Sequence, residues 1–390
     1  MKSFLNYLIE QYDEESGASR QIKHLSQIED KPFHTGEKGA LHSIKALSDV
    51  ATHILNGEKT SQLKTKYDGS PSIVYGYHPE KKKFFVAEKG AFNKTPKINY
   101  TPQDVEKNHG HTPELASKLK DALLHLPKIA PKEGVYQGDI LFTDGDKKVK
   151  NDSVSFKSGS PGIKYIANGS NADKAKKSKI GIVTHVSYQG NNAGSLNASH
   201  EVDHENFGTH KDVMHVDPRM DTAKVHFGPK YRAEFNKQLS DAKKMHDTHG
   251  NQMYDGTSDH HGVKGDLQNF ITHSSDNGIE LNHSNFRKWL EQYKNKELGK
   301  IKNEKNKPKA QEELKNELSK LDRNKRHYDN LFKMHKHLQK AKDVLVDVLD
   351  QHQEFQHEHF GETKSPEGYI FHNGKNGDLF SKRKLTGRNT

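Results

Sequence analysis

Apolar residues recur at helical spacing in the first part of the chain. Positions three or four apart predict an amphipathic helix from about Ala40 to Leu55, ended by Asn56-Gly57, with an apolar face made of Leu41, Ile44, Leu47, Val50 and Ile54. A shorter amphipathic helix is expected around Phe4–Ile9. We therefore expect residues 1–62 to form an N-terminal helical segment.

After residue 62 the pattern becomes strand-like. Short apolar runs bounded by turn residues predict strands at Leu63–Lys66, Ser72–Tyr77, Phe84–Ala87, Val135–Phe142, Val154–Phe156 and Ile180–Ser187. Thr112-Pro113-Glu114 is typical of a helix start, and a helix is expected from there to about Leu126. Residues 63–190 thus form a β-rich module.

From residue 191 to 364 the chain reads as an insertion. Gly, Asn, Asp and His dominate up to about residue 280, with one clear helical stretch around Tyr231–Met245. Leucines at three-four spacing between Leu314 and Leu349 then predict a long helix or a helical hairpin. Strands return at Gly368–Phe371 and Leu379–Lys382, so residues 365–390 are expected to close the β-rich module. The fold class is therefore α+β, with a β-rich core and a large helical insertion.

Composition narrows the function. The 62 Lys and Arg against 52 Asp and Glu give a net charge of +10 and a pI near 9.2, which favours a polyanionic partner, nucleic acid or nucleotide phosphate. With no cysteine, disulfides, thiolate zinc sites and cysteine nucleophiles are excluded. No apolar stretch approaches the ~18 residues of a membrane span, and no secretory signal is evident, so we expect a cytoplasmic protein with no membrane partner.

One short motif carries candidate chemistry. Lys66-Tyr67-Asp68-Gly69 comes directly after a predicted strand, so the lysine can project from a rigid strand end, while the glycine lets a ligand approach the backbone. The motif has only three fixed positions in a lysine-rich chain, and an ordinary surface lysine is the alternative. The order of the later motifs along the chain strengthens the functional interpretation.

Five further segments occur in a fixed order: Glu88-Lys89-Gly90, Gln137-Gly138-Asp139, Ile180–Val183, Glu367-Gly368-Tyr369-Ile370, and Lys382-Arg383-Lys384. With the lysine motif, this series resembles the covalent nucleotidyltransferase superfamily of ATP-dependent DNA ligases, RNA ligases and mRNA capping enzymes. The resemblance covers about 150 residues in two blocks and leaves the insertion out. It implies that the β-rich core is the antiparallel-sheet nucleotidyltransferase core of these ligases.

The resemblance implies a role for each matching residue. Lys66 would attack the α-phosphate of ATP and form a lysine–AMP phosphoramidate, with Asp68 holding the substrate end or a metal-bound water. An amine of ordinary pKa is protonated at neutral pH and must be activated, as burial and neighbouring cations can do. Glu367 would hold Mg²⁺ (or Mn²⁺), with Asp68 as a second metal ligand. The nucleotide contacts implied are Gly69, Lys89, Asp139, Ile182, Glu367, Lys382 and Lys384.

Several positions depart from the superfamily's pattern. Pro71 stands where many DNA ligases have arginine, Lys64 replaces a common glutamate, and Asp139 replaces the usual glutamate of its motif. The chain also ends six residues after Lys384, which leaves no room for a C-terminal OB domain. We therefore expect RNA rather than DNA as the substrate, with the insertion taking over the clamping role.

Three further features have open interpretations. His200 and His204 would have metal-ligand spacing if their segment were helical, and solvated or phosphate-facing histidines are the alternative. The charged stretch Lys302–Arg326 is either a solvated face or a clamp on a nucleic-acid backbone. The N-terminal residues resemble short leaders of tailed-phage proteins, although an ordinary amphipathic helix explains them equally well.

The resemblance therefore implies an ATP-dependent polynucleotide ligase that joins 5′-phosphate to 3′-hydroxyl ends, in RNA repair or DNA repair. Its partners would be RNA or DNA strand ends. The alternatives are a DNA ligase of the same mechanism, a capping-like nucleotidyltransferase, and a catalytically inactive basic nucleic-acid-binding protein.

Overall fold

The computed structural model describes residues 25–88, 97–157, 159–160, 162–189, 196–359, 362–364, 367–373 and 376–382. These residues form a mixed α+β protein with antiparallel sheets, which confirms the predicted fold class at that level. The predicted helix at Phe4–Ile9 lies outside the described residues. Among the helices that the structure describes, none is long and apolar enough to cross a membrane.

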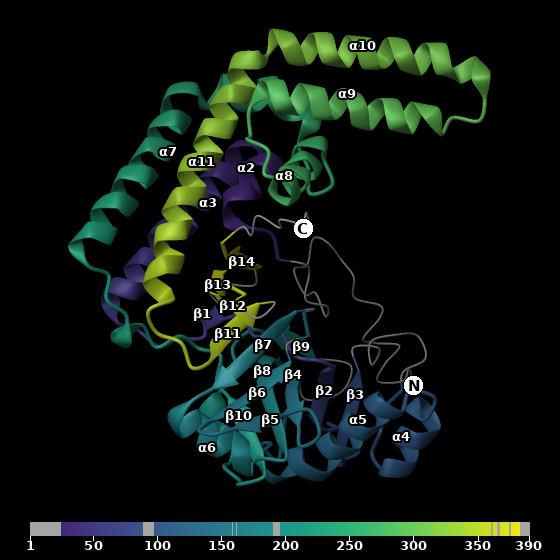
Figure 1. The fold of residues 1–390 in the computed structure, drawn as a ribbon, viewed down its shortest axis with the longest axis vertical. Helices are drawn as coiled ribbons and strands as arrows, with labels where there is room; N and C mark the ends of the chain where they lie inside the picture. The colour runs from purple at the N-terminus through teal and green to yellow at the C-terminus, as the bar shows by residue number, and fades with distance from the viewer. Residues whose placement is uncertain are drawn as a thin grey trace. The chain divides into compact units, whose positions relative to one another are not determined.

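The described chain divides into two compact units (Figure 1). Residues 59–221 and 352–377 form the sheet unit, and residues 26–58, 222–351 and 378–382 form the helical unit. The sequence pattern predicts boundaries at 62, 190 and 364 instead. Residues 196–221 belong to the sheet unit because they add strands to its largest sheet.

The sheet unit is built on a six-stranded sheet in the order β10–β8–β4–β2–β3, with β9 beside β8. The pairs are antiparallel except for β10, which runs parallel to β8. The strands are β2 (Ser72–Tyr77), β3 (Phe84–Glu88), β4 (Val135–Thr143), β8 (Ile180–Gln189), β9 (Asn197–Ser199) and β10 (Val213–Val216). The four strands predicted here agree with β2, β3, β4 and β8 to within two residues.

Two smaller sheets complete the β structure. One has the order β12–β11–β7–β6–β5, and the other has the order β1–β13–β14. Their strands are β1 (Leu63–Thr65), β5 (Lys148–Lys150), β6 (Ser153–Lys157), β7 (Ile163–Ala167), β11 (Gln356–His359), β12 (Glu362–Lys364), β13 (Tyr369–Asn373) and β14 (Asn376–Phe380). The last strand begins and ends earlier than the predicted Leu379–Lys382.

Apolar clusters cover both faces of the largest sheet. On one face, Ile140 and Ile182 pack with α5 (Pro113–His125), and α4 (Pro102–His109) lies beside α5. On the other face, Leu141 and Val183 pack against Tyr165 of β7 and α6 (Gly169–Lys177). The second cluster also takes in Tyr67, which places the lysine motif on that face of the sheet.

The helical unit consists mainly of long amphipathic helices. Its helices are α2 (Lys31–Thr35), α3 (Glu37–Asn56), α7 (Pro229–Thr257), α8 (Asp266–Asn277), α9 (His283–Gly299), α10 (Lys307–Arg323) and α11 (Lys325–Leu349). α7 and α11 lie side by side, and α9 and α10 form a hairpin (Figure 1). Two predictions for these helices were wrong in detail. Leu41 was expected on the apolar face of α3 but is half exposed. The helix expected around Tyr231–Met245 is α7, which continues 12 residues beyond Met245.

Candidate functional site

Strand pairing brings Lys66 and Glu367 together across 301 residues of sequence. β1 pairs antiparallel with β13, with Thr65 opposite Tyr369. The Lys66 N–H donates to the Gly368 carbonyl at 2.8 Å, which continues the pairing one residue beyond β1. Glu367 is the next residue of the partner segment, and Lys66 Nζ donates to its Oε2 at 2.9 Å.

Asp68 completes a group of one ammonium and two carboxylates. Its Oδ2 lies 3.9 Å from Lys66 Nζ. The Ser160 hydroxyl donates to the same Asp68 oxygen at 2.8 Å and lies 3.5 Å from Glu367 Oε2. The ammonium and the hydroxyl therefore share the same two carboxylate oxygens, one from the lysine motif and one from the Glu367 motif.

The site is open on one side and fixed on the other. The side chain of Glu367 is 6% exposed, whereas those of Lys66 and Asp68 are 31% and 37% exposed. The fully buried Tyr165 donates its hydroxyl to Glu367 Oε1 at 3.0 Å and accepts the Asp68 N–H at 2.8 Å. A rigid aromatic side chain thus positions the buried carboxylate, while the amine remains accessible to a ligand.

Gly69 lets the motif turn lie directly against β4. A Cβ at this position would stand 2.5 Å from the Ile140 carbonyl oxygen and 3.0 Å from the Asp139 Cβ, distances that only glycine allows. Asp139 therefore lies beside the turn, as the motif order implies. Its Oδ2 is 3.4 Å from His185 Nε2, and its side chain is largely buried.

The structure describes two of the other predicted nucleotide contacts, Ile182 and Lys382. Ile182 is fully buried on the opposite face of the sheet, because it pairs with Ile140, whereas Asp139 pairs with Val183. Lys89 and Lys384 lie outside the described residues. Lys382 belongs to the helical unit, where its ammonium pairs with Asp347.

Two residues of the site were not foreseen, Ser160 and Tyr165. Ser160 follows Gly159, whose N–H donates to the Asp68 carbonyl at 2.9 Å, so this loop packs directly on the motif turn. Tyr165 occupies an inward position in the alternating burial pattern of β7. Alternation could have predicted the strand and the burial of the tyrosine, but it could not have shown the carboxylate that its hydroxyl reaches.

A second lysine lies two residues before the first and is almost completely buried. Lys64 Nζ donates to the carbonyls of His200 and of His185, the latter at 3.4 Å. Burial lowers the pKa of the Lys64 ammonium to about 8. Lys64 is therefore a second amine beside the lysine motif, and its pKa is lower than that of a free lysine.

The segment of His200 and His204 is not helical, so the spacing that would have made these histidines metal ligands is not realised. His200 follows β9 and His204 starts a single 3-10 turn, so the two do not share a helical face. The His200 ring instead stacks on His372, with ring centroids 3.9 Å apart. Burial lowers the pKa of His200 to about 4, of His204 to about 3, of His215 to about 4 and of His372 to about 2.

These depressed pKa values predict acid sensitivity. Below pH 6.5 the unfolded chain binds protons that the folded histidines do not bind, so the free energy of unfolding falls as the pH falls from 6.5 towards 4. Each histidine contributes up to about 1.4 kcal/mol per pH unit. Urea unfolding at about pH 7, 6 and 5 measures the slope. His204→Phe should reduce it and the exposed His111→Asn should not; an unchanged slope in His204→Phe would rule this explanation out.

Two other clusters bring three potential metal ligands together among the described residues: Glu29, Asp30 and His335; and His260, Asp266 and Glu317. Both already contain an ammonium group. Lys342 Nζ lies 2.6 Å from Glu29, and Lys294 Nζ lies 3.0 Å from Asp266. Both clusters belong to the helical unit and are separate from the Lys66 site.

A protein-family model matches residues 22–388, and the chain therefore belongs to that family, which is described as a family of unknown function (DUF6267). No curated protein and no solved structure matches the chain.

Proposed function

We propose that this protein is a covalent nucleotidyltransferase that takes AMP from ATP onto Lys66 and uses it to seal polynucleotide ends, RNA in preference to DNA. The observation that supports this most is the meeting of Lys66 with Glu367 and Asp68, at 2.9 Å and 3.9 Å. These three residues come from two motifs of the superfamily that the sequence resembles. The sheets packed on either side of the turn suit a nucleotidyltransferase core.

The chemistry proceeds through three displacements at phosphorus. Neutral Lys66 Nζ forms a bond to the α-phosphorus of ATP, the bond from that phosphorus to the bridging oxygen breaks, and pyrophosphate leaves while the surplus amine proton passes to solvent. An oxygen of a 5′-phosphate then attacks the same phosphorus, and the P–N bond breaks as Lys66 regains a proton. Finally a 3′-hydroxyl displaces AMP and joins the strands. In-line positioning and electrostatics supply most of the rate in such reactions.

The two carboxylates fit a magnesium or manganese ion. Mg²⁺ is usually held by one or two carboxylates together with water and substrate phosphates, and Glu367 and Asp68 offer such oxygens with the Ser160 hydroxyl between them. A bound Mg²⁺ or Mn²⁺ would neutralise charge on the phosphates. Because the Lys66 ammonium contacts the same oxygens, a bound metal would compete with it for them, and metal binding would thereby favour release of the amine.

Incubation with ATP labelled at the α-phosphate, followed by a denaturing gel, tests this proposal. The wild-type chain should retain α-label but not γ-label. Glu367→Gln should form the adduct about 10²–10³ times more slowly, because it loses a charge placed at the reacting groups. Glu106→Gln is the matched control, since Glu106 is an exposed partner of Lys120. The absence of α-label with both ATP and GTP would reject the proposal.

A sealing assay assigns the substrate. We expect joining of single-stranded RNA with a 5′-phosphate and a 3′-hydroxyl. Sealing confined to nicked DNA duplex would identify a DNA ligase of the same mechanism, and nucleotide transfer without joining would identify a capping-like enzyme. RNA binding without any adduct would identify an inactive binding protein.

A further inference from the structure

An aromatic stack lies on an outer face of α9. Trp289 and Tyr293 are one helical turn apart, with ring centroids 5.0 Å apart and planes only 11° from parallel. Trp289 is half-buried, because it packs on Phe270 and Phe286, whereas Tyr293 is 37% exposed. The stack therefore begins in the core of the helical unit and ends with a tyrosine ring in solvent.

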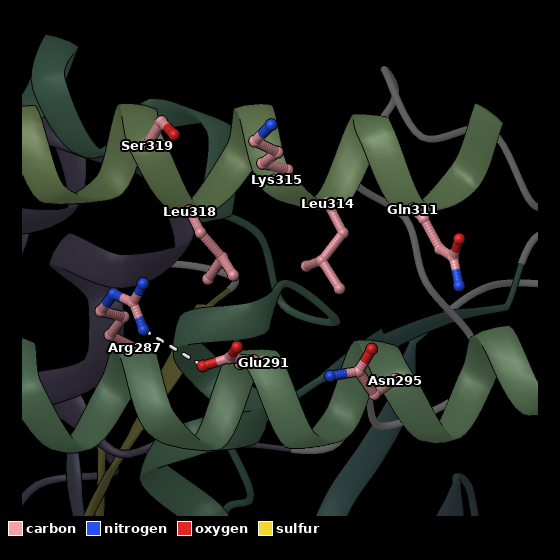
Figure 2. Close-up of a pocket in the computed structure, with 8 residues that line it drawn as sticks. All are labelled: Arg287, Glu291, Asn295, Gln311, Leu314, Lys315, Leu318 and Ser319. Carbon is pink, nitrogen blue, oxygen red and sulfur yellow. Dashed lines mark hydrogen bonds and ion pairs between the residues drawn. The ribbon is translucent and has the colours of Figure 1, made fainter. Parts of the chain in front are cut away.

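This face of α9 is turned away from α10. Figure 2 shows Arg287, Glu291 and Asn295 of α9 on the side that faces α10, where they line a shallow groove with Leu314 and Leu318. Tyr293 is two positions from both Glu291 and Asn295, which places it on roughly the opposite side of a helix with 3.6 residues per turn. The groove in Figure 2 is thus the contact seam of the hairpin, and the aromatic stack lies outside it.

Positive charge continues from the stack along the same face. Lys296 and Lys300 follow Tyr293 at three and seven residues, which keeps them on its side of the helix, and both are exposed. Between residues 296 and 309 the chain carries six lysines against two glutamates. Lys300 also pairs with Glu297 at 2.6 Å, an exposed pair of the weak kind that a phosphate can displace.

We propose that this face of α9 and the loop beyond it bind single-stranded RNA, with a base stacked on Tyr293 and phosphates on Lys296, Lys300 and Lys302. Exposed aromatic rings beside a track of positive charge are what unpaired nucleotides require, since every base has a face to stack and every linkage carries a negative charge. A duplex offers no free base face. The choice of RNA rests on the proposed function, but the surface does not include Lys66, so binding and adduct formation can fail separately.

Trp289 supplies the readout, because it is the chain's only tryptophan. Titration of the full chain with a short oligouridylate should quench its fluorescence. A tenfold rise in salt should weaken binding roughly 100-fold if three phosphates are contacted. Tyr293→Ala should weaken binding about 5- to 150-fold, and Tyr293→Phe should restore it to within about twofold. The matched control is Tyr231→Ala on α7, because Tyr231 is also 37% exposed.

Three outcomes would overturn the proposal: no quenching by the oligonucleotide, unchanged affinity in Tyr293→Ala, or duplex RNA bound as tightly as the single strand. Single-stranded DNA bound more than about tenfold more tightly would overturn the assignment to RNA. The α-label assay on Tyr293→Ala should give the wild-type adduct. Quenching in a wild-type chain that forms no adduct would reject the proposed function and leave this binding surface supported.

Discussion

Replacing Lys66 with arginine is expected to abolish formation of the covalent nucleotide adduct. Arginine keeps a positive charge and a long side chain beside Glu367 and Asp68, so the ion pairs at this site can be retained. A guanidinium does not lose its proton at any pH at which the protein is folded, and it therefore has no lone pair with which to attack phosphorus. If the variant is folded but forms no adduct, the loss is due to the missing nucleophile and not to a lost positive charge at this site.

Lys64 provides the comparison for this experiment. It is buried, and its pKa of about 8 leaves part of it neutral near physiological pH, so chemistry alone would allow it to react. Lys64→Met should keep the ability to form the adduct wherever it folds, as judged by circular dichroism. If Lys66→Arg retains the adduct while Lys64→Met loses it, the assignment of the nucleophile is wrong.

Replacing Lys342 with methionine is expected to destabilise the helical unit by about 3–5 kcal/mol. The ammonium of Lys342 lies 2.6 Å from Glu29 Oε1, and both side chains are fully buried. The substitution would leave a carboxylate in the interior without the ammonium that now neutralises it. Urea unfolding followed by circular dichroism measures the free energy of unfolding in the wild type and the variant.

Two controls separate charge burial from loss of side-chain volume. Lys45→Met removes an exposed partner of Asp49 and should cost no more than about 1 kcal/mol. The double variant Glu29→Leu/Lys342→Met removes both charges of the fully buried pair and should be more stable than Lys342→Met alone, because the Glu29 carboxylate is no longer left without its ammonium. A double variant that is less stable than the single one would contradict this account of the pair.

Much of the fold could be predicted from local pattern. β2 has the predicted bounds, and the three-four leucine spacing in α10 and α11 corresponds to buried positions. β11 could not be predicted, because Gln356–His359 contains no apolar residue and is a strand only through its pairing with β7 and β12. α4 was overlooked although Thr101 and Asp104 form a capping box, which is a local signal.

α7 shows how tertiary contacts override local propensity. Gly250 and Gly256 make the stretch beyond Met245 a poor helix by sequence, at about 1 kcal/mol each. A Cβ at Gly256 would lie 2.7 Å from the His327 ring of α11, so the glycine allows the two helices to approach closely. Contact along α11 therefore extends the helix to Thr257.

The candidate site, too, could be predicted from the sequence only in part. Of the residues that the order of the motifs singled out, Lys66, Asp68, Gly69, Asp139 and Glu367 lie around one turn. Ile182 does not, because it lies on the opposite face of the sheet. Ser160 and Tyr165 could not be found in this way, because neither lies in a motif and each acts through a contact with a distant segment. For the histidines the sequence left two interpretations open, and the structure removes the helical spacing that the metal interpretation required.

The most direct test of the central claim is peptide mapping by mass spectrometry after incubation of the wild-type chain with ATP and Mg²⁺. We predict one AMP bound through a phosphoramidate to Lys66, which acid would release and alkali would not. AMP attached to Lys64 or to another lysine, or a chain that carries no nucleotide under conditions in which it binds RNA, would contradict it.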